Sequence, residues 1–380
     1  MNKINILEPN ILKNSKRALI KTLAKNQIST SSINIIKKFE NKISVLSGSK
    51  FTVATNTGSS ALYAGFKSLE IKHNDLIIMP SYTFIATATS CILAGGSPWF
   101  FDIEKNSLTL NLDQIESVLE NKTFKKGKYY FHKKNKQRIF AICPVYTLGF
   151  LPNLKRIKKI AKKYNLKIIS DAACALGAQF NQTKLSNYSD LVCYSFNGNK
   201  SFTAGGGGAV STNNKKLYDR LVLSITNGKT GQYFHESFGL NLKITGVHAA
   251  IGFGQLNNFN KILKRKNKIR ENYKKFFKLN NIKFIDIFNK KIILWLNFLI
   301  CKRDINQKLI INAKKFNINL NFFWMPMHLQ PIMRKYIAED QKNTNNIWKK
   351  ILVLPSSDNI KNSKQDKVKN FLKRNLRLIN

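Results

Sequence analysis

The sequence predicts an α/β protein with a large, mostly parallel sheet covered by helices and a smaller C-terminal α/β domain. From residue 51 to about 226, short apolar runs alternate with helical patterns, as expected for strands joined by crossover helices. Near residue 255 this alternation gives way to a long basic segment, beyond which strands and helices alternate less regularly. We therefore predict an N-terminal arm and large domain over residues 1–255, and a small domain over 256–380.

Seven short apolar runs in the large domain are typical of buried strands. These predicted strands are residues 51–55, 76–79, 98–102, 139–145, 167–170, 191–196 and 207–211. Residues 153–164 predict an amphipathic helix, because apolar residues such as Leu154 and Ile157 share one face while the lysines take the other. The first fifty residues are helical in pattern and polar, so we expect them to pack across the large domain or a neighbouring subunit.

The small domain begins with a basic helix predicted over residues 256–278, where apolar residues recur at helical spacing. The most apolar stretch of the chain, IILWLNFLI at residues 292–300, follows it. This stretch is far shorter than the roughly 20 residues that a membrane helix needs, so it predicts a buried strand. We expect no membrane insertion.

The chain is strongly basic, with 64 Lys and Arg against 20 Asp and Glu and a formal net charge of +44. Clustered basic residues would indicate a nucleic acid or an anionic membrane as a partner. Here the lysines are spread along the whole chain, without zinc-finger spacing, an Arg-rich arm or an RNP-like strand. The pattern favours a basic solvated surface, and we predict no nucleic-acid partner.

The cysteines stand singly, without C-x-x-C spacing, and the N-terminus has no apolar signal segment. The five cysteines are Cys91, Cys143, Cys174, Cys193 and Cys301. This pattern is typical of reduced thiols in a cytoplasmic protein. We predict no metal site.

One lysine, Lys200, stands out because it follows the apolar run 191–196 and precedes four glycines at 205–208. A P-loop requires a glycine directly before its lysine, so that backbone N–H groups cradle a phosphate. Asn199 occupies that place and the glycines come afterwards, which disfavours a P-loop. The glycines instead provide room for the backbone to pass close to a ligand or to pack tightly.

The alternative is that Lys200 is a catalytic amine. A lysine is a poor nucleophile at neutral pH unless it is partly buried or forms an imine with a carbonyl cofactor such as pyridoxal phosphate (PLP). PLP also needs a carboxylate at its ring nitrogen, N–H donors at its phosphate and a flat or apolar neighbour. Asp171 directly follows a predicted strand, at the edge where open α/β sheets bind ligands, and is the predicted partner of the ring nitrogen.

Candidates to bind the phosphate and to contact the ring of PLP also lie at strand ends. They are Gly58, Ser59 and Ser60 at a predicted helix start and Ser195 for the phosphate, and Phe84 for the ring. Each has a purely structural alternative: a helix cap, an ordinary turn or a core position. Their joint occurrence favours the PLP site.

Eight segments extend this pattern over nearly the whole chain. They are residues 39–62, 80–103, 144–154, 168–178, 194–210, 249–256, 324–331 and 352–357. In these segments, among them IISDAACALGA (168–178) and YSFNGNKSFTAGGGGAV (194–210), the chain resembles the DegT/DnrJ/EryC1/StrS sugar nucleotide aminotransferases. These are fold type I PLP enzymes, so the resemblance implies that fold, with PLP bound in the large domain.

The resemblance also implies residue roles. Lys200 would be the Schiff-base lysine, Asp171 the partner of the ring nitrogen and Phe84 the ring neighbour. The residues implied at the phosphate are Gly58, Ser59, Ser60 and Ser195. Cys174 stands beside the cofactor where the family often has Gln, His or Glu. Asn241 would reach the phosphate of the other subunit, which implies a homodimer with shared active sites.

Similar chains move the amino group of glutamate to the keto carbon of a nucleotide-linked 4-keto-6-deoxy sugar. Such products enter amino-sugar glycans of the lipopolysaccharide or O-antigen type, and several motifs lean towards UDP-linked N-acetylated sugars. Lys243 and Asn321 stand where relatives frequently carry Arg. The alternative hypothesis is an aminotransferase-like PLP-binding protein with a regulatory or structural role.

Overall fold

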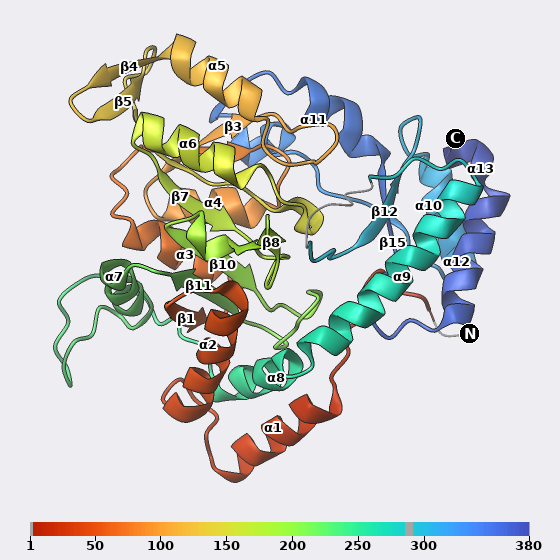
Figure 1. Cartoon of the computed structure of the whole chain (residues 1–380), viewed down its shortest axis with the longest axis horizontal. Coiled ribbons are helices and arrows are strands. Elements are labelled where there is room, and N and C mark those ends of the chain that lie inside the picture. The colour runs from red at the N-terminus through yellow and green to blue at the C-terminus, as the bar shows by residue number, and fades with distance from the viewer. Residues whose placement is uncertain (1–2, 286–291, 380) are drawn as a thin grey trace.

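The computed structural model describes residues 3–285 and 292–379. Within these residues the main sheet has ten strands, which lie at the centre of the large unit (Figure 1). In spatial order its main path is β1 (Phe51–Thr55), β11 (Gly208–Thr212), β10 (Leu191–Ser195), β7 (Lys167–Asp171), β6 (Arg138–Ile142), β2 (Leu76–Pro80), β3 (Ser97–Phe101) and β14 (Ile337–Ala338). From β10 to β14 neighbouring strands are parallel, while β11 runs antiparallel to both of its neighbours. The hairpin of β4 (Thr123–Lys126) and β5 (Tyr129–His132) extends from β6.

The seven predicted strands of the large domain are all present, and one of them ends three residues earlier than predicted. The run 139–145 forms a strand only to Ile142. Pro144 has no N–H to donate to a neighbouring strand, which interrupts the ladder. Val145 rejoins the sheet as an isolated bridge to Asp171. The sequence therefore located this strand correctly but overestimated its length.

Helices cover both faces of the sheet, because successive strand residues point to opposite sides. One face packs against α2 (Ile33–Ser47), α5 (Leu112–Lys122), α6 (Leu154–Tyr164) and α8 (Gly246–Leu256). The other packs against α3 (Gly58–Ser68), α4 (Ile85–Leu93) and α7 (Lys215–Ile225). The alternation is visible in β2, where Ile78 belongs to the first core and Ile77 to the second.

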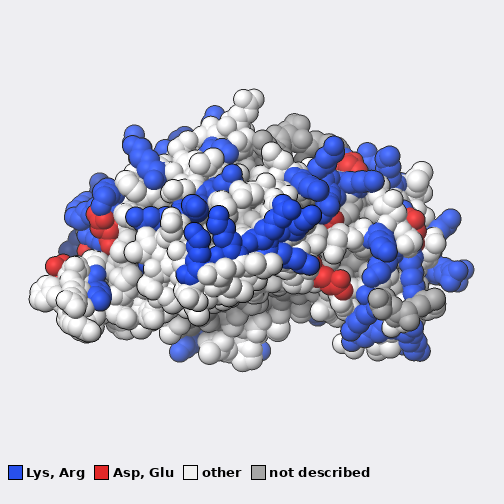
Figure 2. Space-filling model, turned by 90° about the horizontal axis from the view of Figure 1, so that it is seen from below, with Lys and Arg blue, Asp and Glu red and all other residues white. Residues whose placement is uncertain are grey.

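The lysines occupy the outer sides of these helices. Helix α6 buries Leu154 and Ile157, as predicted, and ends at the left-handed Asn165. Figure 2 shows Lys and Arg along the whole visible face, with a denser band across its centre. No helix in the described part of the chain is both long enough and apolar enough to cross a membrane.

The N-terminal segment packs against the large unit rather than forming a core of its own. Helix α1 (Lys13–Ala24) and helix α2 both contact α8. The close approach of α1 to α8 depends on Gly254, because a Cβ there would lie 2.4 Å from Ser15 Cα. The expected packing of this segment across the large domain is thus observed.

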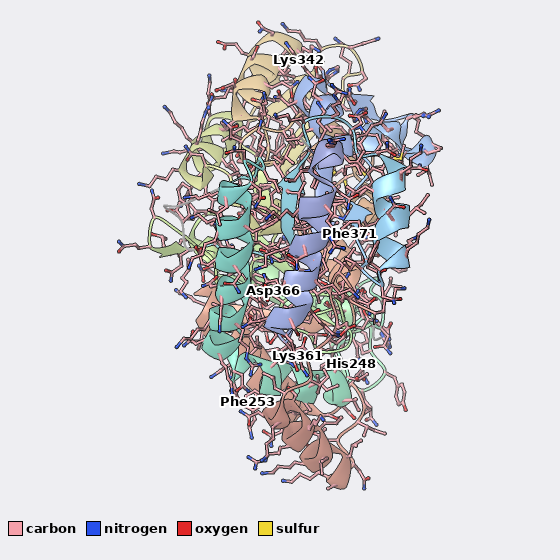
Figure 3. All side chains as sticks on the ribbon, turned by 90° about the vertical axis from the view of Figure 1, so that its right-hand side faces the viewer. His248, Phe253, Lys342, Lys361, Asp366 and Phe371 are labelled. Carbon is pink, nitrogen blue, oxygen red and sulfur yellow. The ribbon has the colours of Figure 1, made fainter. Side chains whose placement is uncertain are left out.

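Residues beyond α8 build a second, smaller unit. Its sheet has the order β12 (Asn297–Ile300), β15 (Ile351–Leu354), β13 (Asn321–Phe322). Its core also takes side chains from α9 (Phe259–Leu279), α10 (Gln307–Lys315), α12 (Asn362–Arg374) and α13 (Leu376–Ile379). Figure 3 shows α12, which carries Asp366 and Phe371, alongside α9. The division of the chain after residue 255 remains a prediction.

Two details of this unit differ from the predictions. The helix predicted over 256–278 is α9, which begins only at Phe259 and ends at Leu279, because α8 ends at Leu256. Of the apolar stretch 292–300, only residues 297–300 form a strand. Trp295 instead donates its backbone N–H to Leu148 O (2.9 Å), in the large unit.

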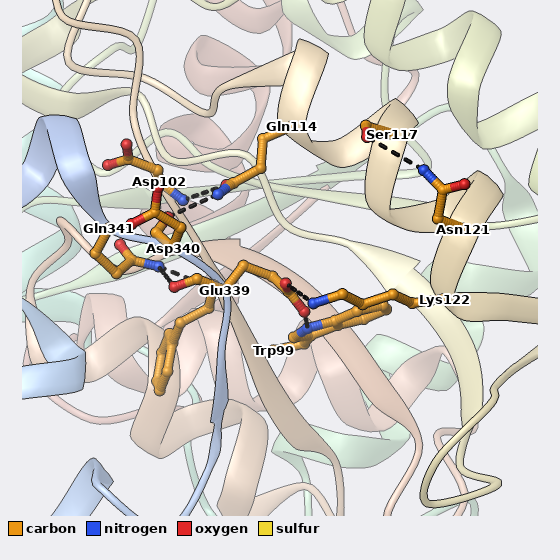
Figure 4. Close-up of polar contacts among 10 residues, drawn as sticks. Trp99, Asp102, Gln114, Ser117, Asn121, Lys122, Glu339, Asp340 and Gln341 are labelled. Atoms are coloured by element: carbon orange, nitrogen blue, oxygen red, sulfur yellow. Dashed lines mark hydrogen bonds and ion pairs between the residues drawn. The ribbon is translucent and has the colours of Figure 1, made fainter.

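One segment of the C-terminal half returns to the main sheet. Strand β14 pairs in parallel with β3, and helix α11 (Lys342–Ile347) follows it. Figure 4 shows how the intervening residues are fastened: Glu339 accepts hydrogen bonds from Trp99 and Lys122. Gln114 donates to the backbone of Asp340. This attachment fixes the small unit beside the carboxyl ends of the parallel strands.

Candidate active site

A cavity of about 300 Å³ opens at the carboxyl ends of the parallel strands. Seven of the nine residues predicted for the site line it: Gly58, Ser59, Phe84, Asp171, Cys174, Ser195 and Lys200. They come from segments between residues 58 and 200 that are far apart in the chain. The two main hydrophobic cores pack on opposite faces of this sheet, so the strands that carry the cavity residues are held rigidly.

The start of α3 forms one corner of the cavity. Thr57 caps the helix, because its hydroxyl accepts a hydrogen bond from the backbone N–H of Ser60 (3.0 Å). The N–H groups of the first helical turn lack intrahelical partners and, with the helix dipole, favour an anion. Gly58 lets the end of β10 approach this turn, since a Cβ there would lie 2.7 Å from Ser195 Cβ.

Two predicted residues lie outside the cavity. The Ser60 hydroxyl is paired with Thr57 Oγ1 (2.8 Å), and its backbone N–H is taken by the Thr57 cap. Asn241 is exposed in the segment that follows α7 and does not line the cavity of its own chain. Its expected contact with a second subunit stays a prediction.

Asp171 ends β7 as a buried carboxylate, with only 6% of its surface exposed. Thr87 Oγ1 donates to its Oδ2 (2.7 Å), and the backbone N–H of Ala173 donates to its Oδ1 (3.1 Å). Burial raises the pKa of Asp171, while the hydrogen bonds from Thr87 and Ala173 and the charge of Lys200 oppose that rise. A cationic group in the cavity would therefore stabilise the charged carboxylate.

Lys200 lies in the turn that follows β10, with its amine directed into the cavity. The Nζ atom is 3.4 Å from Cys174 Sγ and 3.8 Å from the centre of the Trp295 ring. Among the residues that the structure describes, no carboxylate forms an ion pair with it. Burial raises the pKa of the Cys174 thiol, so the neighbour of the amine is a neutral S–H group.

The glycines after Lys200 serve close packing. Gly205 and Gly207 adopt positive φ angles of 81° and 124°, which favour glycine. A Cβ at Gly208 would lie 2.3 Å from Thr57 O. Strand β11 can therefore pass directly behind the turn that begins α3, in agreement with the predicted need for room.

The structure adds residues that the sequence reasoning missed. Thr87, within the quoted segment 80–103, lies one helical turn after Phe84, and its bond to Asp171 had no separate sequence signal. Trp295 and Trp324 form an aromatic wall, with ring centres 6.2 Å apart. Trp324 belongs to a segment that carried the resemblance, whereas Trp295 lay in a stretch predicted to be an ordinary strand.

These residues fit PLP by the chemistry of the donor set. An amine that pairs with no carboxylate of residues 3–285 and 292–379, a buried carboxylate and the start of a helix surround one cavity. Their functions match the aldehyde, the ring nitrogen and the phosphate of the cofactor, respectively. Aromatic side chains line the remaining wall.

Comparisons with known proteins support this interpretation. Residues 9–373 match the model of the DegT/DnrJ/EryC1/StrS aminotransferase family. The chain is 31% identical to GDP-perosamine synthase of Escherichia coli O157:H7 over 277 residues, which is 72% of this chain and 71% of the relative. It is 29% identical, over 87% of both chains, to UDP-4-amino-4,6-dideoxy-N-acetyl-beta-L-altrosamine transaminase of Campylobacter jejuni.

The fold recurs in solved structures. Spr1654 from Streptococcus pneumoniae, in its PLP-form, superimposes with a TM-score of 0.87 at 19% identity and is covered over 100% of both chains. The matches confirm the predicted α/β fold of type I PLP enzymes and the predicted activity, a PLP-dependent sugar aminotransferase. Because the family model spans almost the whole sequence, the chain belongs to the DegT/DnrJ/EryC1/StrS aminotransferase family.

Proposed function

We propose that this enzyme moves the amino group of glutamate to the keto carbon of a nucleotide-linked 4-keto-6-deoxy sugar. The observation that carries the proposal is the convergence of Lys200 and Asp171 on one cavity beside the start of α3. Two relatives named above are, by their names, a GDP-perosamine synthase and a transaminase of a UDP-linked 4-amino-4,6-dideoxy sugar. Their shared feature is an amino sugar linked to a nucleotide, and the nucleotide differs between them.

Within the proposed reaction, bound PLP supplies an electron sink that stabilises negative charge at the carbon next to the amine. Lys200 would hold the cofactor through Nζ. Its amine, when free, would act as the base and then the acid that moves a proton. Its turn after β10 keeps Nζ in the cavity, because the Lys200 backbone N–H donates to Asn197 O (2.9 Å).

Asp171, as a charged carboxylate, would hold a proton on the ring nitrogen of the cofactor. Thr87 keeps that carboxylate oriented, through the hydrogen bond to Oδ2. The first turn of α3 and the Ser195 hydroxyl would bind the phosphate. The aromatic wall of Trp295 and Trp324 excludes water from the side of the cavity that faces the small unit.

We further propose that the enzyme works as a homodimer. Support comes from the segment that follows α7, which exposes Tyr233, Phe234 and Phe238 with 89%, 64% and 95% of their surfaces accessible. Exposed aromatic clusters of this kind are typical of protein interfaces. Asn241 lies in the same segment, consistent with its proposed contact with the phosphate of the other subunit. Residues 1–255 and 256–380 are the proposed domains.

The test is a substrate panel. Purified enzyme with PLP and glutamate is offered UDP-, GDP- and dTDP-linked keto sugars, and aminated products are identified by mass and NMR, with Lys200→Ala as the control. One aminated nucleotide sugar, absent with the control, is the expected result. Failure of glutamate alone to convert the bound PLP to the pyridoxamine form would contradict the proposal. That outcome would favour a PLP-binding protein with a regulatory or structural role.

A further inference from the structure

Trp295 contacts the Lys200 turn at two places. Its indole Nε1–H donates to the carbonyl oxygen of Asn199 at 2.6 Å, directly before the lysine. Its ring centre lies 3.8 Å from Lys200 Nζ, at the other end of the lysine side chain. One side chain thus contacts both the backbone from which Lys200 starts and the amine in which it ends.

Trp295 is itself fixed from several sides. Its side chain and backbone are buried, with 6% of the residue exposed. Its backbone N–H donates to Leu148 O (2.9 Å), and its carbonyl accepts from the Nζ of Lys266, a buried residue of α9 (2.9 Å). Its ring contacts Trp324 and Phe323, with centres 6.2 and 6.1 Å away. A side chain held in this way can act as a rigid reference point for a flexible lysine.

The surroundings of the Lys200 amine explain why a ring face matters there. Nζ also contacts the Cys174 thiol, which is neutral. An aromatic face attracts an ammonium group, most strongly when water is excluded. Phe84, another aromatic side chain of the cavity, is 55% exposed and lies farther out, against Trp324. Among the described residues, Trp295 is therefore the aromatic side chain whose ring face lies against the amine.

We propose that Trp295 is a positioning residue that holds Lys200, whenever its amine is free, in the orientation required to form its covalent bond with PLP. The proposal rests on the proposed role of Lys200. It assigns the indole two separable contributions, the N–H that fixes the turn and the ring face that orients the amine. The residue belongs to the segment leading into β12, a strand of the small unit.

The experiment compares two ligands of the cofactor-free protein. PLP is mixed with the protein, and the fraction captured covalently is measured over time by borohydride reduction and intact mass. Pyridoxamine phosphate, which has no aldehyde and binds without a covalent bond, is titrated in parallel. A residue that positions only the lysine affects the first measurement and not the second.

Trp295→Leu removes both contributions and is expected to slow PLP capture by about tenfold or more, because the turn loses the N–H that fixes it and Nζ loses the ring face that limits where it lies. Trp295→Phe keeps a ring face without the N–H and is expected to be intermediate. Pyridoxamine phosphate affinity should fall by a clearly smaller factor than PLP capture, since non-covalent binding does not depend on where the Lys200 amine lies. Trp348→Leu is the matched control, because Trp348 packs on the same hydrophobic cluster but does not line the cavity.

The outcomes are distinguishable. Capture at the wild-type rate in both Trp295 variants would overturn the positioning role. Equal losses of PLP capture and pyridoxamine phosphate affinity would also overturn it, by showing a general structural effect. If Trp295→Leu does not fold, the Trp295→Phe comparison alone decides. Covalent capture that persists in Lys200→Ala would instead contradict the proposed function on which the inference depends.

Discussion

Replacing Thr87 by valine tests whether hydrogen bonding keeps the buried Asp171 carboxylate charged for its cofactor. Thr87 is fully buried in α4, and its hydroxyl donates to Asp171 Oδ2 at 2.7 Å. Only one further hydrogen bond, from Ala173 N, reaches this carboxylate among the described residues. Valine has nearly the shape of threonine but cannot donate, so the change removes one of two hydrogen bonds without creating a large cavity.

The expected magnitude follows from that geometry. A hydrogen bond to a charged group contributes roughly 1.5–3 kcal/mol, and each 1.4 kcal/mol is a factor of ten in an equilibrium constant. We therefore expect Thr87→Val to weaken binding of pyridoxamine phosphate about 10- to 100-fold. Pyridoxamine phosphate is the appropriate probe, because its binding does not include the covalent bond to Lys200.

The pH dependence should change in a defined direction. Burial already raises the pKa of Asp171, and removing a hydrogen bond to the charged form raises it further. The ring nitrogen binds best to the charged carboxylate, so affinity falls as the pH drops through this pKa. In Thr87→Val the fall should begin at a higher pH than in the wild type.

Two controls make the result interpretable. Thr87→Ser keeps the hydroxyl and should keep most of the affinity. Thr89→Val removes a hydroxyl that donates to backbone carbonyls of the same helix, Ile85 O (3.1 Å) and Ala86 O (3.4 Å), and this variant should bind pyridoxamine phosphate normally. Wild-type affinity and an unchanged pH profile in Thr87→Val would refute the reasoning.

Three further predictions concern other parts of the molecule. Gly58→Ala should weaken PLP binding about tenfold or more, because the added Cβ would lie 2.7 Å from Ser195 Cβ and push the start of α3 away from the end of β10. Spectroscopic titration with PLP measures this affinity. Wild-type affinity would contradict the prediction. Burial lowers the pKa of Lys266 from its ordinary 10.5 to about 8. Between these two pH values the unfolded chain binds a proton that the folded protein releases, so folding stability gains about 3 kcal/mol as the pH rises. Denaturant unfolding at several pH values should show this gain in the wild type and not in Lys266→Met, and parallel pH profiles would contradict it. Asn241→Ala and Lys200→Ala should each be inactive. Activity should return when the two variants are mixed and allowed to exchange subunits, because one active site of each mixed dimer then contains both Lys200 and Asn241. No recovery of activity although mixed dimers form would argue against a shared site.

The sequence was most informative about the large sheet. Its strands are short apolar runs bounded by turns, and burial between two helical layers leaves them little other structure to adopt. Two strand lengths were predicted wrongly, where the apolar pattern continued beyond the end of the strand. Strand β6 was placed correctly but ends at Ile142, because Pro144 interrupts the hydrogen-bond ladder. In the apolar stretch 292–300 only residues 297–300 form a strand, while Trp295 bonds to Leu148 in the large unit.

The candidate site was predictable where it lies at strand ends. Asp171, Ser195 and Lys200 follow strands of one parallel sheet, and parallel strands bring their carboxyl ends together. Trp295 was not predictable in this way, because its contact with Lys200 depends on how the small unit packs on the large one. Ser60 does not line the cavity, and its backbone N–H donates to the Thr57 hydroxyl, so its role at the phosphate stays a prediction.

The central claim is that Lys200, alone among the lysines of this chain, bonds covalently to PLP. Its most direct test is borohydride reduction of the PLP-loaded protein, followed by proteolysis and mass spectrometry of the labelled peptides. The account predicts one modified residue, Lys200, a yellow absorption that reduction removes, and no label in Lys200→Ala. A stoichiometric label on another lysine, or a colourless wild-type protein after incubation with PLP, would contradict it.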